Sequence, residues 1–451
     1  MTYKHKVIWL AISSLFSFSG MILQSCSNDL PYEIKAEGSS EEVFPTSIRD
    51  EKEAIQIALD GYSLFYLDND DSRSNNAIIL PKEIIKINRN ISRGANENEP
   101  LLYIVNFEND RGYAIVLANR NAEPLLAVSD NGNYDNCLTD QIPGFGLWME
   151  NAISYAEATN TASQGTSITP DFPLIPDDNL LQTKSWNDTI SHRMVKPQLE
   201  IAWGQGNGNT TDISRKDCEG FYFPNGICGC AGLAIAQVCA GLKMPTSLNE
   251  IYPGVGTQYN FDWDAIRNHK ACRLVLNGVP QESGTCFESQ SNKSGVHQSI
   301  ARLCKIIGNY GNAQPNGSET SMTSDNLRRA ASLVFGASRV SSSWNELLIE
   351  SSIYEGQMMI VIGDPKNTGE GGHAWVCDGC EYVSYIHYDA TRNHSYEEWK
   401  IISSFTESRS YFHFNWGWNS LGNGWYMNLT PDVNHVSDTG YNNLRFILIQ
   451  K

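Results

Sequence analysis

The chain has 451 residues, of which 41% are hydrophobic and 10% aromatic, the proportions of a folded globular protein and not of a disordered one. Its formal net charge of −18 excludes nucleic acid as a partner, because so acidic a chain offers no basic stripe to neutralise phosphates. The same charge argues against direct binding to an anionic membrane, and we interpret it as a solvated exterior. The length suggests two or three folded units.

The first residues have the pattern of an export signal. Lys4 and Lys6 precede a largely apolar run over residues 7–23, which is the charged-then-apolar order of a secretory signal. A Leu-Gln-Ser-Cys box at residues 23–26 looks like a bacterial lipoprotein cleavage site, so we expect Cys26 to carry a lipid and become the new N-terminus. An ordinary signal peptide with an incidental cysteine is the alternative. We predict an exported lipoprotein of the outer membrane or cell surface, attached to the membrane only through its lipid, whose mature domain can be released.

Composition divides the chain into five segments. The signal peptide covers residues 1–25, and a polar tether covers residues 26–43. A small α+β unit is expected over residues 44–158. A Thr-, Ser- and Pro-rich linker over residues 159–196 follows, and exposed linkers of this kind are where proteases cut. The remainder, residues 197–451, forms the second and larger unit.

The small unit is expected to begin with a helix, to continue as a sheet and to close with a second helix. Residues 47–50 resemble a capping box, after which apolar residues recur at helical spacing. The closing amphipathic segment runs from residue 147 to 156. Between the two helices lie three β-rich runs joined by polar turns, typical of an antiparallel meander: residues 101–107, 112–118 and 125–129.

The larger unit places helices before strands, which is the order of an α+β fold and not of a βαβ alternation. Helical periodicity covers residues 296–307 and 324–334. Five strands are expected later, at residues 358–362, 373–377, 411–416, 425–429 and 445–450.

Cys230 lies where a glycine turn meets a helix. The sequence Ile-Cys-Gly-Cys-Ala-Gly-Leu-Ala-Ile-Ala-Gln over residues 227–237 delivers Cys230 onto a run of small, helix-favouring residues that Pro245 stops. A helix N-terminus provides free amide donors and the positive end of the helix dipole, both of which favour the thiolate that a nucleophilic cysteine needs. The alternative is a small buried residue on an alanine-rich core helix, and this segment alone does not decide between the two.

His373 follows a glycine-rich loop and begins an alternating strand. Glycines let the backbone approach a substrate chain, and the strand fixes the direction of the imidazole. An imidazole beside a thiol can form a thiolate–imidazolium pair and act as the base for acyl transfer. Most of the nine histidines should nevertheless be surface or satisfied core residues.

Two further segments contain polar side chains suited to the same chemistry. Asn415 and Trp416 lie in an aromatic-rich strand, where the Asn could accept the second N–H of an imidazole and the Trp could shield it, although such aromatic density usually means core packing. Gln205 lies in a Trp-Gly-Gln-Gly-Asn turn, and a Gln amide can donate to a developing oxyanion. A turn that merely contains Gln is the alternative.

In this order, Gln205, Cys230, His373 and Asn415-Trp416 resemble the papain-like cysteine proteases, and more closely the streptopain family of secreted bacterial proteases. The resemblance extends to the small unit, whose segments at residues 112–116 and 124–127 are similar to the inhibitory propeptide of that family. It rests in the larger unit on the motifs at residues 203–207, 229–231, 234–237, 262–264, 372–374 and 415–418.

The resemblance implies a fold, an activity and a set of roles. The fold is α+β: a papain-like protease of two subdomains, one helical and one an antiparallel sheet, preceded by a small α+β propeptide domain. Cys230 would be the nucleophile, His373 the base, Gln205 the oxyanion donor, and Asn415 with Trp416 the orienting groups. Substrates would be polypeptides, the propeptide would cover the cleft until proteolysis removes it, and no cofactor or metal is implied. A role in virulence is also expected.

The sequence departs from the family pattern at three places. Cys228 stands where relatives commonly have a small polar residue, and its pairing with Cys218 is more plausible than a strained ring with Cys230. Residues 379–410 look like an insertion before the Asn-Trp strand, which weakens the assignment of the orienting residues. Near residues 436–440 a long glycine-rich flap is missing, so substrate preference can differ.

Three other functions remain open on sequence alone. Cys228 and Cys230, with Cys377 and Cys380, supply four thiols for a zinc site, although one intervening glycine is a tight spacing. A catalytically inactive relative could bind peptides or a host surface protein. A transglutaminase-like acyl transferase is the third alternative, and the propeptide resemblance disfavours it.

Overall fold

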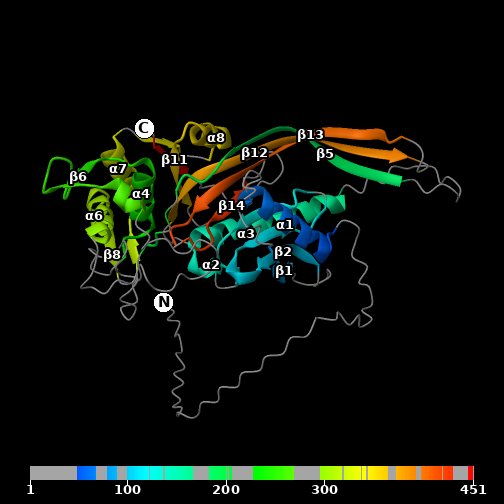
Figure 1. Cartoon of the computed structure of the whole chain (residues 1–451), viewed down its shortest axis with the longest axis horizontal. Helices are drawn as coiled ribbons and strands as arrows, with labels where there is room; N and C mark the ends of the chain where they lie inside the picture. Colours follow the sequence, from blue (N-terminus) through cyan, green and yellow to red (C-terminus); the bar gives the residue numbers. More distant parts are fainter. Residues whose placement is uncertain are drawn as a thin grey trace, which may run out of the picture. The chain divides into compact units, whose positions relative to one another are not determined.

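The described part of the chain is built on one long antiparallel sheet (Figure 1). The computed structural model describes residues 48–67, 79–88, 99–120, 122–135, 138–165, 182–199, 201, 203–205, 227–268, 295–316, 319–336, 338–341, 344–363, 372–392, 398–418, 420–429 and 445–449. The predicted signal peptide, the lipidated Cys26 and the tether lie outside these residues, as does Cys218. None of the helices in the described ranges has the length and apolar character that a bilayer-spanning segment needs.

The small unit has the predicted order of helix, meander and closing helix. The capping box that begins the first helix consists of Asp50 and Glu53, whose side chains and backbone amides pair reciprocally, and not of residues 47–50 as expected. The expected helix and strands are present, with one strand that the sequence did not suggest, β1. The elements are α1 (Glu51–Tyr66), β1 (Pro81–Asn88), β2 (Pro100–Phe107), η1 (Glu108–Asp110), β3 (Tyr113–Leu117), β4 (Leu125–Ser129), α2 (Leu138–Gln141) and α3 (Pro143–Gly165).

The sheet of the small unit continues into the sheet of the larger unit. Strand β4 pairs antiparallel with β14 (Gly424–Met427), so the strand order runs β1-β2-β3-β4-β14-β13-β12-β11-β15-β10. The remaining strands of this path are β10 (Ser338–Ser341), β11 (Met358–Gly363), β12 (His373–Arg392), β13 (Lys400–Asn415) and β15 (Arg445–Ile449). The five strands predicted for the larger unit are therefore confirmed, although β12 and β13 are much longer than expected.

The extra length of β12 and β13 contains the predicted insertion at residues 379–410. The two strands continue as one long hairpin, and β5 (Gln182–Val195) pairs with β12 along the same stretch (Figure 1). We call this three-stranded extension, residues 182–195, 380–392 and 400–410, the arm. Strand β5 lies within the predicted linker, 159–196, and α3 extends into it to Gly165, so only residues 166–181 lie outside the described part. Tertiary pairing with β12 supplies the backbone partners that the polar composition of this segment did not suggest.

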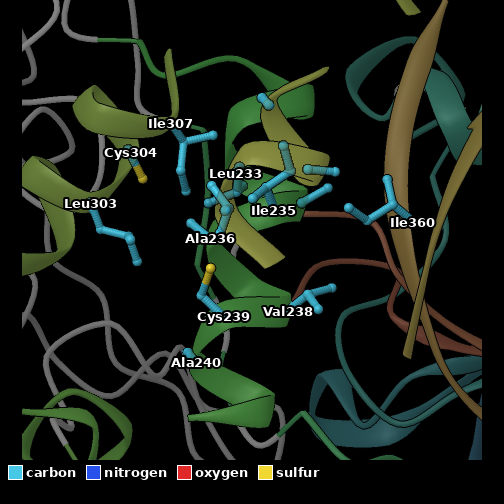
Figure 2. Packing of buried hydrophobic residues seen from close by; sticks show 14 of the residues in the cluster. Leu233, Ile235, Ala236, Val238, Cys239, Ala240, Leu303, Cys304, Ile307 and Ile360 are labelled. Carbon is cyan, nitrogen blue, oxygen red and sulfur yellow. The ribbon is translucent and has the colours of Figure 1, made fainter. Parts of the chain in front are cut away.

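The helical part of the larger unit packs around one largely buried helix, α4 (Cys230–Leu242). Its side chains from Ala231 to Ala240 are all buried, which explains why the segment is rich in small and apolar residues and shows no polar face. Figure 2 shows Cys239 and Ala236 of α4 facing Leu303, Cys304 and Ile307 of α6, with Ile360 of β11 on another side. The surrounding elements are α5 (Trp263–Asn268), α6 (Gly295–Tyr310), α7 (Ser324–Phe335) and α8 (Glu346–Tyr354), with two small hairpins, β6 (Ser247–Asn249) with β7 (Gln258–Asn260) and β8 (Gln314–Asn316) with β9 (Glu319–Ser321).

Candidate active site

Cys230 is the first residue of α4, and a glycine in the left-handed region delivers it there. Gly229 has φ +77°, and a Cβ at that position would lie 2.2 Å from the carbonyl oxygen of Thr320, so no other residue fits this turn without displacing the β9 backbone. No side chain caps the helix, so its first amides are available to the Cys230 thiol. The turn predicted from the sequence is therefore confirmed.

The electrostatic setting of the Cys230 thiol combines opposing effects. Burial raises the pKa of the Cys230 thiol, while hydrogen bonding from the backbone amides of Ala374, Ala231 and Cys230 itself lowers it, and Glu319 raises it further. The balance raises the pKa of the thiol above its ordinary value, which favours the protonated form. The amide of Ala374 is informative, because it belongs to the residue that follows His373.

His373 begins β12, where it pairs with Gly363 of β11. Burial lowers the pKa of the His373 imidazole below its ordinary value. The neutral imidazole is therefore favoured. The structure brings the start of the strand that carries His373 to the thiol of Cys230, and burial disfavours the charged form of both groups in the full chain.

Gln205 lies in the backbone beside the nucleophile turn. Its carbonyl oxygen accepts a hydrogen bond from the amide of Cys228 at 2.8 Å, and Gly204 forms a bridge to Trp418. The Gln205 side chain is half-buried. Cys228 itself is 1% exposed, so it belongs to the wall beneath the turn.

Asn415 is at the end of β13, and its side chain has other partners than His373. Its Oδ1 accepts hydrogen bonds from Gln237 Nε2 at 2.9 Å and from the amide of Gly417 at 3.1 Å. Its Nδ2 donates to the carbonyl of Ile201 at 3.1 Å. The sequence did not assign a role to Gln237, although it lies seven residues after Cys230 on α4, a spacing that puts both on one helix face.

Trp416 packs beside the strand that carries His373. Its ring centroid lies 5.0 Å from that of Trp375, two residues after His373, and its indole N–H donates to the carbonyl of Gly422 at 3.0 Å. The N-terminal end of α3 covers this pair: a Cβ on Gly144 would lie 2.8 Å from Trp416 and 3.3 Å from Trp375. The small unit therefore contacts the immediate surroundings of the candidate site.

The four thiols of the zinc alternative all lie in the described residues. Cys230, Cys377 and Cys380 carry free thiols. Among the residues that the structure describes, no three His, Cys, Asp or Glu side chains are grouped as metal ligands would be. The zinc alternative therefore has no support from these positions.

Comparison with known proteins gives two family matches and several similar solved structures, of which two are described here. Residues 203–426 match the model of the peptidase C10 family, and residues 46–156 match that of the Spi protease inhibitor. A structure of a Prevotella intermedia prointerpain A fragment is 16% identical, with a TM-score of 0.45 over 81% of this chain and 98% of that one. A structure of the active Prevotella intermedia interpain A cysteine protease is 17% identical, with a TM-score of 0.34 over 56% of this chain and 94% of that one. No curated protein matches the chain.

Proposed function

The chain belongs to the peptidase C10 family of cysteine proteases and carries an inhibitor propeptide, and from that membership we propose that Cys230 and His373 perform the hydrolysis. The Cys230 sulfur attacks the peptide carbonyl and His373 receives the thiol proton. His373 then gives the proton to the leaving amine as the C–N bond breaks. Water attacks the resulting thioester with His373 as base, which releases the acid product and restores the thiol.

One observation carries this assignment. The thiol at the uncapped N-terminus of α4 is in contact with the backbone amide of Ala374, which adjoins His373. Residues 230 and 373 are far apart in the sequence. The helix that begins at Cys230 and the strand that begins at His373 therefore meet only because the fold brings them together. A buried core cysteine on an alanine-rich helix would have no reason to meet the one strand that begins with a histidine after a glycine-rich loop.

We propose supporting roles for three other residues. Gln205 donates its side-chain amide to the developing oxyanion, which is supported by the backbone hydrogen bond that holds it beside Cys228. Trp416 shields the imidazole, supported by its contact with Trp375. Asn415 orients His373 in the activated enzyme. While the propeptide is in place, Asn415 Oδ1 accepts hydrogen bonds from Gln237 and Gly417, so this role requires that Asn415 change its hydrogen-bond partner on activation.

We further propose that the protein is exported and anchored by a lipid on Cys26, from which the protease domain is released after the propeptide is removed. The support is the sequence pattern of residues 1–26, an apolar run that ends in a lipoprotein-type box. A secreted protease of this kind would act on host polypeptides, consistent with a role in virulence. Incorporation of labelled palmitate that is lost in a Cys26→Ala variant tests the anchor.

Covalent labelling tests the catalytic assignment. A thiol-directed epoxide should add once to the activated protein, at Cys230, as located by peptide mass spectrometry, and the Cys230→Ala variant should neither label nor hydrolyse casein. Cys228→Ala is the matched control, because it replaces the buried cysteine two residues before Cys230 and should retain labelling and hydrolysis. Normal casein hydrolysis by Cys230→Ala would refute the proposal.

A further inference from the structure

The carboxylate of Glu123, in the small unit, is held by a cluster of side chains on the arm and its base. Arg409 Nη1 of β13 donates to Glu123 Oε1 at 2.5 Å. The hydroxyl oxygens of Tyr385 and Tyr411 lie 3.4 Å from Glu123 Oε2 and 3.5 Å from Glu123 Oε1, and each donates its single proton to a nearer acceptor, so Arg409 is the donor that holds the carboxylate. The side chains of Glu123 and Arg409 are only 11% and 26% exposed, so this ion pair is shielded from the solvent that would weaken it.

The segment after Glu123 pairs through its backbone. Tyr411 Oη donates to the carbonyl of Leu125 at 2.6 Å, and β4 then pairs antiparallel with β14, Ala127 opposite Tyr426 and Ser129 opposite Gly424. Backbone pairing of this kind accepts almost any sequence, whereas the Arg409 cluster demands an acid. The combination therefore recognises an extended chain with a carboxylate two residues before an apolar strand.

The docked segment runs toward the candidate active site. Its acidic N-terminal end lies at Arg409, and its C-terminal end reaches Asn423, whose carbonyl accepts from Ser129 Oγ at 2.7 Å. The side chain of Asn423 in turn accepts from the amide of Trp416 at 2.9 Å. A chain bound in this direction therefore continues toward Trp416, which lies beside the candidate active site.

We propose that removal of the propeptide turns this surface, formed by Arg409, Tyr385, Tyr411 and the free edge of β14, into a docking site for substrate polypeptides. The occupant is an extended segment with a Glu or Asp two residues before a short apolar run. This inference rests on the proposed function, because it requires that the small unit leaves the activated protease.

Two other acidic residues lie near Arg409, and a substrate carboxylate would have to compete with them for the guanidinium. Glu381 lies on the same face and is 1% exposed, and Glu407 Oε2 accepts from Tyr385 Oη at 2.5 Å. Neither makes a hydrogen bond to the Arg409 guanidinium within the described part of the chain, where Glu123 alone is its ion-pair partner. The carboxylate position is therefore vacated when Glu123 leaves.

The test is a binding cycle between a peptide and the activated enzyme. The full chain is activated by limited proteolysis, the small unit is removed, its absence is checked by intact mass, and the thiol is blocked with iodoacetamide. The probes are fluorescein-labelled peptides with the sequence of residues 122–131, one with Glu123 and one with Glu123→Gln. We expect the Glu peptide to bind about tenfold more tightly in fluorescence anisotropy, the effect of one charge-assisted contact.

Two enzyme variants complete the cycle. Arg409→Gln should reduce the tenfold ratio between the two peptides to about one, whereas Arg392→Gln should preserve it, because Arg392 is an arm arginine that stacks on Trp399 instead. The measured quantity is the ratio of the affinities of the two peptides for the same enzyme variant. A variant that binds both peptides more weakly leaves this ratio unchanged, so it cannot be mistaken for loss of the Arg409 contact. Equal affinity of the two peptides for the unmodified enzyme, no binding of either, or a ratio that survives Arg409→Gln would overturn the docking site. Casein hydrolysis by the unblocked enzyme reports separately on the proposed function.

Discussion

Two histidines on neighbouring strands have opposite surroundings. His413 of β13 is 8% exposed, and its Nδ1 lies 2.7 Å from Oδ1 of Asp378, a carboxylate with no exposed surface whose Oδ2 accepts from the amide of Leu199 at 2.7 Å. His373 of β12 is less buried, and no carboxylate of the described part pairs with it.

The difference separates a structural from a reactive imidazole. Asp378 occupies a β-bulge between Cys377 and Gly379, and this bulge turns its side chain into the protein, where it joins β13 to the segment that leaves β5. A histidine fixed in this way holds the sheet together and is not available to substrate. His373 has no such partner, so its protonation state can change when the propeptide leaves.

The largest expected effect is on catalysis at His373. His373→Ala should lower kcat/KM for a peptide substrate by about 10³-fold, since it removes the base that activates the thiol. Hydrolysis of a fluorogenic peptide by the activated enzyme measures it. His413→Ala, compared at a temperature where it remains folded, should retain near-normal kcat/KM; the reverse ranking of the two variants would contradict the separation.

The next effect is on stability at His413. His413→Ala should lower the free energy of unfolding by about 3 kcal/mol, because it leaves the buried Asp378 carboxylate with one amide partner. Urea denaturation of the full chain measures this. His373→Ala, made at a partly exposed position without an ion pair, serves as the control and should cost clearly less.

A pH dependence of stability is expected from Glu381. Burial raises its pKa from 4.5 to about 7, against the opposing influence of Arg409, with Glu123 raising it further. A raised pKa in the folded state means that the stabilisation is complete below pH 4.5 and is lost as the pH rises through about 7, a difference of about 3 kcal/mol. Glu381→Gln should therefore flatten the fall in melting temperature between pH 5 and 8; an unchanged fall would show that burial of Glu381 is not its cause.

The smallest effect concerns the ionisation of Cys230. Burial raises the pKa of the Cys230 thiol and lowers the pKa of His373 in the full chain, where α3 packs on Trp416 and Trp375 beside them. Removal of the propeptide rehydrates both, so half-maximal alkylation by iodoacetamide should move to a lower pH in the activated enzyme than in the full chain. A Cys228→Ala background in both forms keeps the neighbouring thiol out of the measurement. A midpoint that is the same in both forms would mean that the propeptide does not control thiol ionisation.

Local pattern was sufficient for much of this protein. The glycine turn before Cys230, the strand that begins at His373 and the meander at residues 101–129 were predictable because each depends on nearby residues: a positive φ, a period of two, or a run of small helix formers. The order of Gln205, Cys230, His373 and Asn415 indicated a cysteine protease before any contact was known.

Tertiary pairing decided the rest. The segment 182–195 resembles a linker because its composition is polar, yet it becomes a strand once β12 offers a free edge. The hydrogen bond of Gln237 to Asn415, the Asp378–His413 pair and the Glu123–Arg409 pair each join residues distant in sequence. Sequence periodicity reports which face of an element is apolar, but partners across a sheet depend on register and strand order, and these are set only when the whole sheet assembles.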